Sequence, residues 1–126
     1  MVDFRDLKVW KRSHDLALQI YRATETFPKT EVFGLTDQMR RAAVSIPSNL
    51  AEGCGRMTQA ELAQFSQVAM GSASELEYQL ILAHELGYLG AEEFKSLSDN
   101  ITELRKMLNK FIQTVRENKI RPTPKE

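Results

Sequence analysis

The chain has 126 residues, of which 42% are hydrophobic and 27% charged, and its 17 basic side chains balance its 17 acidic ones. This length suits one domain with one core, and the zero net charge argues against a general attraction to nucleic acid or anionic membranes. A single cysteine excludes an intrachain disulfide, and the lack of a long apolar run argues against a membrane span or secretory signal. We expect a cytoplasmic protein with no membrane partner.

The first predicted helix runs from about Leu7 to Thr24. Apolar and small residues recur there at spacings of three, four and seven, which places them on one helix face: Trp10, Ala17, Ile20, Tyr21 and Thr24. Phe27 and Pro28 then end the helix, because proline cannot continue it. Residues 29–34 are predicted to form a loop.

A second helix is predicted to start at Thr36 and to end at Gly53 and Gly55. The Thr36 hydroxyl suits an N-cap, and Asp37 favours the positive end of the helix dipole. Glycines are typical of helix C-termini. The predicted buried stripe of this helix consists of Leu35, Met39, Ala42, Ala43, Ile46 and Leu50.

Pro47 lies in the interior of this second helix. Proline lacks the N–H that would bond to the carbonyl of Ala43, so it costs about 3 kcal/mol unless the structure compensates. We predict a structural kink at Pro47. The hydroxyls of Ser45 and Ser48 are expected to bond the carbonyls that the proline leaves free.

A long third helix follows a capping box formed by Thr58 and Glu61 and ends near Leu86, before Gly87. Its predicted buried side contains Leu62, Phe65, Ala69, Ser72, Leu76, Leu80 and Ala83. The run 71–74 has no bulky side chain, which predicts a close crossing with a neighbouring helix.

The fourth helix has the most regular pattern, with steps of three and four that are typical of bundle packing: Phe94, Leu97, Ile101, Leu104, Leu108, Phe111 and Val115. It is expected to end near Asn118. Four such segments joined by short loops predict an all-α fold, an antiparallel up-down-up-down four-helix bundle. The domain is expected to cover residues 1–118 and a flexible C-terminal tail residues 119–126.

A series of short motifs lies in one order along nearly the whole chain: Phe4, Leu7, Val9-Trp10, Tyr21, Thr24, Phe27-Pro28, Gly34-Leu35-Thr36, 40–49, Ala51-Glu52-Gly53, Gly71-Ser72, Glu75-Leu76-Glu77 and Leu86-Gly87-Tyr88. This order resembles the four helix bundle protein family, also called 23S rRNA intervening-sequence proteins. The resemblance implies an all-α bundle that forms homopentamers, with some members encoded in insertions within 23S rRNA genes. A related protein, the accessory variability determinant of diversity-generating retroelements, works with a reverse transcriptase and nucleic acid.

The residues needed for common bundle chemistry are not at the required positions. A ferritin-like di-iron site needs a glutamate three residues before each histidine. The residues at those positions are Lys11, before His14, and Ile81, before His84. We expect both histidines to be solvated or partner-bonded surface groups. Cys54 has no neighbouring base in sequence, so the sequence predicts no enzyme, no cofactor and no metal.

Arg40 and Arg41, with Arg56 beyond the helix end, form the main basic feature. Guanidinium groups suit phosphate recognition, but Asp37 and Glu52 lie close enough in sequence to pair with them. We prefer a structural or interface role for the three arginines. Direct RNA or DNA binding through a ring of arginines, one set per subunit, remains the alternative.

Several apolar residues fall off the main helix faces: Val68, Met70, Tyr78, Ile81, Met107 and Ile112. Such residues indicate either a wide buried face or a subunit interface, and with the resemblance we favour the interface. We therefore predict a non-enzymatic homo-oligomer, and the family resemblance implies that it is a homopentamer. It would act as a scaffold or accessory protein for a macromolecular partner, such as RNA or an RNA-associated protein.

Overall fold

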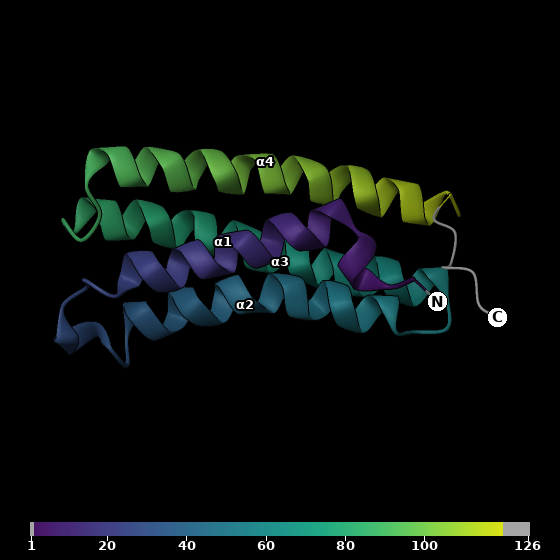
Figure 1. The fold of residues 1–126 in the computed structure, drawn as a ribbon, viewed down its shortest axis with the longest axis horizontal. Helices are drawn as coiled ribbons and strands as arrows, with labels where there is room; N and C mark the ends of the chain where they lie inside the picture. Colours follow the sequence, from purple (N-terminus) through teal and green to yellow (C-terminus); the bar gives the residue numbers. More distant parts are fainter. Residues whose placement is uncertain (1, 120–126) are drawn as a thin grey trace.

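The computed structural model describes residues 2–119, which contain helices and no strand. The four α-helices are α1 (Lys8–Thr24), α2 (Leu35–Cys54), α3 (Gln59–Glu85) and α4 (Ala91–Arg116). Two short 3₁₀ helices, η1 (Phe4–Asp6) and η2 (Lys29–Glu31), precede α1 and α2. The helices lie side by side along the long axis of the molecule (Figure 1). Most of the predicted flexible tail, residues 120–126, lies outside the described residues.

Each helix packs against the next one along the chain, and α1 also packs against α4. Within the described residues, no Cα atom of α1 comes within 8 Å of one in α3, and the same holds for α2 and α4, so these two pairs occupy diagonal corners. In Figure 1, α4 and α2 form opposite edges, with α1 and α3 between them. The fold is the predicted all-α antiparallel four-helix bundle.

The core is built from the predicted apolar stripes. All six stripe residues of α2 are buried, as are all those of α4 except Phe94, which is partly buried against the core. Ile112, which was predicted to lie off the main face, is also buried. The buried face of α4 is therefore wider than its heptad positions, because α4 packs against both α1 and α3.

The start of α2 differs from the prediction at Thr36. The helix begins one residue earlier, at Leu35, and Thr36 is buried in its first turn. The N–H of Leu35 donates instead to the carboxylate Oε1 of Glu31, 3.0 Å away. The expected cap was wrong because the preceding loop folds back and brings a longer side chain to the helix end.

The end of α2 also differs, because Gly53 lies inside the helix and only Gly55 stands at the C-cap. A Cβ added at Gly53 would lie 2.9 Å from the Cβ of Phe65 and 3.0 Å from the Cδ1 of Leu62. Gly53 is thus a point of close helix contact, where the backbone of α2 rests on α3.

The α3 termini follow the predicted signals. The Thr58 hydroxyl oxygen accepts the N–H of Glu61 at 3.1 Å and its O–H donates to the Glu61 carboxylate at 3.1 Å, which confirms Thr58 as the N-cap. At the other end Gly87 has a φ of 84°, and the N–H of Tyr88 donates to the carbonyl of Ala83 at 2.9 Å. This is a Schellman cap, in which glycine supplies the left-handed residue.

Pro47 is buried inside α2, and the helix continues on both sides of it. The expected role of Ser45 was wrong: its hydroxyl lies 2.7 Å from the hydroxyl of Ser72 on α3 rather than on a freed carbonyl. The side-chain amide of Asn49 donates to the Ser45 carbonyl at 2.8 Å. Serine hydroxyls therefore join two helices here. The contact brings α2 against Ser72, within the predicted crossing run 71–74, whereas Gly71 and Ser74 of that run are exposed.

Candidate interaction surface

An apolar groove of about 550 Å³ lies between α1 and α2, and we call it the α1–α2 groove. Aromatic, aliphatic and small side chains line it: Phe4, Trp10, His14, Ala17, Leu18, Tyr21, Val44, Pro47, Ser48 and Ala51. Its polar side-chain groups are the His14 imidazole, the Ser48 hydroxyl, the Trp10 indole N–H and the Tyr21 phenol. A concave surface of this composition suits an apolar partner more than a charged ligand.

The N-terminal wall of the groove is a stack of aromatic rings. The Trp10 ring meets Phe4 edge-on, with centroids 4.9 Å apart, and stacks on His14 with centroids 5.1 Å apart. Phe4 reaches this position because η1, capped by the Asp3 side chain, turns the chain back over α1. Aromatic rings held against one another have little freedom to lose on binding, which favours a recognition surface.

The rim of the groove remains open to solvent at three large apolar side chains, Leu18, Tyr21 and Val44, which are 41%, 43% and 40% exposed. Tyr21 was predicted to share one helix face with Ala17, Ile20 and Thr24; these three are buried, and Tyr21 lies at the exposed edge of that face. Leu18 and Val44 were not predicted to belong to an interaction surface. The sequence feature that could have indicated it is that both are large apolar residues outside the main apolar stripe of their helix.

Arg40 is committed to the internal structure of the bundle. Its Nε donates to the Thr24 hydroxyl at 2.8 Å, and its Nη2 donates to the Tyr21 carbonyl at 3.2 Å. The guanidinium carbon also lies 4.7 Å from the centre of the Tyr21 ring. Arg40 therefore caps the end of α1 and holds the Tyr21 ring at the groove rim.

Arg41 and Arg56 each pair with an acidic residue one helical turn away. The Arg41–Asp37 distance is 3.1 Å and the Arg56–Glu52 distance is 2.9 Å. The Arg41 side chain is 80% exposed, whereas Arg56 also lies over the Phe65 ring. Arg41 and Arg56 are about 15 residues apart along α2 and its end, which corresponds to roughly 22 Å of helix. Arg40, Arg41 and Arg56 therefore form no single cluster within one chain.

A second set of exposed apolar residues lies on α3, where Val68, Tyr78 and Ile81 are 46%, 61% and 42% exposed. All three belong to the residues predicted to lie off the main faces. Met70 and Met107 from the same set are partly buried against the core. The structure thus divides the predicted interface residues into an exposed group on α3 and a group that completes the core.

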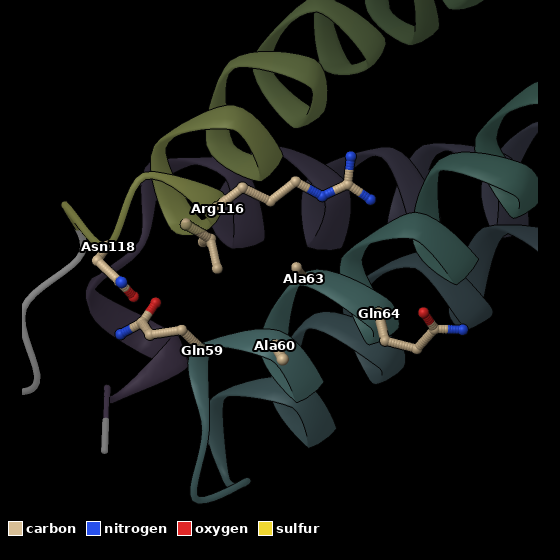
Figure 2. A pocket seen from close by; sticks show the side chains of 7 residues that line it. Gln59, Ala60, Ala63, Gln64, Arg116 and Asn118 are labelled. Carbon is tan, nitrogen blue, oxygen red and sulfur yellow. The ribbon is translucent and has the colours of Figure 1, made fainter.

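A polar hollow of about 430 Å³ lies between the start of α3 and the end of α4 (Figure 2). In this view the amide ends of Gln59 and Asn118 face each other across the hollow, and Gln64 points away along α3. No carboxylate, histidine or cysteine lines it, so it has neither a general base nor a metal ligand of the usual kinds.

The remaining chemical groups are held by the fold. The Nδ1 of His84 lies 2.9 Å from the Leu89 carbonyl and its ring stacks on Phe94, whereas His14 is exposed, as expected for partner-bonded and surface groups. Burial raises the pKa of the Cys54 thiol to about 11. Among residues 2–119, no three His, Cys, Asp or Glu side chains are grouped as a metal site would require.

Over the same part of the chain, every helix is too short or too polar to serve as a membrane span.

None of the curated proteins matches the chain. A solved structure with a similar fold is a protein of unknown function from the S23 ribosomal protein family of Bacteroides thetaiotaomicron VPI-5482, at 26% sequence identity and a TM-score of 0.77. The match covers 84% of this chain and 96% of that one. The pattern of the family described as 23S rRNA-intervening sequence protein matches residues 5–110, which is most of the chain. The chain therefore belongs to the 23S rRNA-intervening sequence protein family.

Proposed function

We propose that the protein is a non-enzymatic homo-oligomer of the cytoplasm that serves as a scaffold or accessory protein for a macromolecular partner. The observation that carries the proposal is the α1–α2 groove with its exposed rim of Leu18, Tyr21 and Val44. Leaving such a concave apolar surface in water is unfavourable, and association with another protein surface removes it. The homopentamer implied by the family resemblance is the assembly we propose.

The commitment of reactive side chains to packing supports a role without catalysis. Ser45 bonds to Ser72 and Asn49, and the buried Cys54 thiol has a pKa raised to about 11 by desolvation, which keeps it in the unreactive thiol form at neutral pH. Arg40 is bonded to Thr24 and Tyr21. These groups stabilise the bundle, and a ring of bundles would present its outer surfaces to a partner many times over.

Light scattering at micromolar concentration tests the assembly. We expect a mass several times the 14.4 kDa of one chain, and a mass near 14.4 kDa would refute the proposal. A pull-down from the native cell, with nucleic acid retained, then tests for the partner. A protein that is recovered both with and without nuclease treatment is a direct partner. Recovery of RNA, with loss of the accompanying proteins after nuclease treatment, indicates an RNA partner.

The alternative function is direct RNA or DNA binding through arginines. Its support is the exposed Arg41 side chain, which borders a hollow of about 470 Å³, and the rRNA association in the family's description. Salt-dependent binding to RNA that is lost in Arg41→Ala would favour this function. Binding that is undetectable at low salt would exclude it.

A further inference from the structure

The outer side of α3 has an unusual composition for a solvent-facing helix surface. Six residues follow one another at alternating steps of three and four, and all are exposed and uncharged: Gln64, Gln67, Gly71, Ser74, Tyr78 and Ile81. We call them the α3 seam. Apolar residues are spread around α3 far more evenly than around the other three helices. A helix with this distribution is normally covered on more than one side.

Within the chain's own packing, nothing accounts for the small residues of the α3 seam. A Cβ added at Gly71 would meet no atom within 4 Å among the described residues. Glycine in a helix interior costs about 1 kcal/mol relative to alanine, so the position is costly without a neighbour. Gly71 and Ser74 have small side chains, so the helices of another protein can approach this part of α3 closely. Tyr78, one turn further along, extends outward from the same face.

The charges of α1 and α3 are complementary. The α1 helix carries four basic residues, Lys8, Lys11, Arg12 and Arg22, and one acidic residue, Asp15. The α3 helix carries four glutamates and neither lysine nor arginine, and Glu75 and Glu85 beside the α3 seam are exposed. Two copies of the α1–α2 groove facing each other would bring two basic α1 helices together, whereas the groove facing α3 places basic α1 beside a helix of opposite charge.

We propose that the α1–α2 groove of one copy receives the α3 seam of a second copy, with Tyr78 as the anchor between Trp10 and the Leu18–Val44 rim. The inference rests on the proposed function, because it names the two surfaces through which the chain associates. Since α1 and α3 occupy diagonal corners, the two surfaces lie on different sides of one bundle. The contact is therefore heterologous: a pair of copies still has one unoccupied groove and one unoccupied α3 seam. Further copies can add to these surfaces until the assembly closes into a ring.

A mixing experiment with two variants tests this arrangement. Val44→Glu blocks the groove with a carboxylate that faces acidic α3, and Tyr78→Glu removes the anchor of the α3 seam. Both residues are exposed in the single chain, so we expect both variants to fold, as circular dichroism would show. Each substitution should weaken association by at least about 30-fold and leave single chains of 14.4 kDa in light scattering.

An equimolar mixture of the two variants should form dimers, because one intact groove meets one intact seam. Dimers that stop at twice the chain mass confirm the heterologous contact. If the wild type associates and Tyr78→Glu still associates like it, or if the mixture stays monomeric, the arrangement is wrong while the proposed function stands. A monomeric wild type would refute both.

Two further variants guard against an effect on folding. Gly71→Lys extends a long cation from the α3 seam toward basic α1, and the open space around Gly71 predicts that the bundle tolerates it. We expect the same loss of association as in Tyr78→Glu, and unchanged association would contradict the proposal. Val32→Glu is the matched control, since Val32 is 52% exposed in the loop after η2, outside both surfaces, and this variant should assemble normally.

Discussion

The phenol of Tyr88 donates a hydrogen bond to the Glu31 carboxylate at 2.9 Å, although 57 residues separate them in sequence. Glu31 thereby joins the loop between α1 and α2 to the turn between α3 and α4. Its other carboxylate oxygen accepts the N–H of Leu35, at 3.0 Å. The Phe27 ring lies 5.2 Å from the Tyr88 ring beside this contact. One carboxylate thus starts α2 and fastens both connections at that end of the bundle.

Glu31 should make stability depend on pH in the acid range. The bonds from the Leu35 N–H and then the Tyr88 hydroxyl lower its pKa below the ordinary 4.5. The unfolded chain therefore binds more protons near that pH, so the contribution of Glu31 is complete above the ordinary pKa and is lost as pH falls through the lowered one. We expect Glu31→Gln to weaken the acid dependence of the urea midpoint. Glu103→Gln, at an exposed position in the middle of α4, is the control and should leave the dependence unchanged.

The two glycines Gly53 and Gly71 should respond oppositely to alanine. At Gly53 the added methyl would lie 2.9 Å from the Phe65 Cβ, and overpacking of this kind costs about 1–3 kcal/mol. At Gly71 the methyl meets nothing within the chain, so Gly71→Ala should stabilise the helix by up to about 1 kcal/mol. Urea denaturation at concentrations where the chain is monomeric measures both. Equal shifts in one direction would contradict the packing described at Gly53.

The Ser45 and Ser72 hydroxyls should depend on each other. They lie 2.7 Å apart between α2 and α3, so Ser45→Ala leaves the Ser72 hydroxyl without its partner and should cost about 1 kcal/mol. The double variant with Ser72→Ala should cost less than the sum of the two single variants. A double-mutant cycle from denaturation curves measures the difference, and strictly additive effects would show that the bond contributes nothing.

Arg40 and Arg41 are adjacent in sequence but should differ in their effect on stability. Arg40→Ala removes the bonds to Thr24 and Tyr21, and hydrogen bonds to charged groups contribute about 1.5–3 kcal/mol. Arg40→Lys should not restore the loss, because an ammonium lacks the planar fork that reaches both acceptors. Arg41→Ala, which removes only an exposed ion pair, should change stability by less than about 1 kcal/mol. Thermal denaturation that ranked the two alanine variants in the reverse order would be inconsistent with this geometry.

Cys54 should react with thiol reagents only when the bundle opens. The side chain is 3% exposed, and desolvation raises its pKa to about 11, so little thiolate is present at neutral pH. We expect modification by a disulfide reagent at pH 8 to be slow in the native protein and rapid in denaturant. Rapid labelling without denaturant would mean that the α2–α3 turn opens easily.

The helices and most of the core could be predicted from the sequence because both depend on local periodicity. The α4 stripe and the Thr58 cap are read within one or two turns of chain, and the structure confirms both. Thr36 and Gly53 were predicted wrongly for the same reason: their roles depend on Glu31 and Phe65, which other segments bring to them. The residues around a helix end do not indicate which group from another segment will contact that end in the folded protein.

The candidate surface was less predictable than the fold. The arginines were visible as a basic motif, but only the three-dimensional contacts show that Arg40 is bonded to α1 while Arg41 is exposed. Leu18 and Val44 lie on different helices, and each alone looks like an ordinary surface residue. Their proximity follows from the packing of α1 on α2, so a groove between helices has no signature within either one.

The up-down-up-down path brings the start of the ribbon, before α1, and the end of α4 to the same end of the bundle (Figure 1). Phe33, which is 93% exposed, lies in the loop after η2 between α1 and α2. The four helices could therefore be connected in a different order along the chain and still pack in the same way. A circular permutant that links the segment before α1 to the end of α4 and opens the chain at Phe33 would keep the four α-helices whole, and it would give fluorescent labels a new attachment point in the loop between α1 and α2.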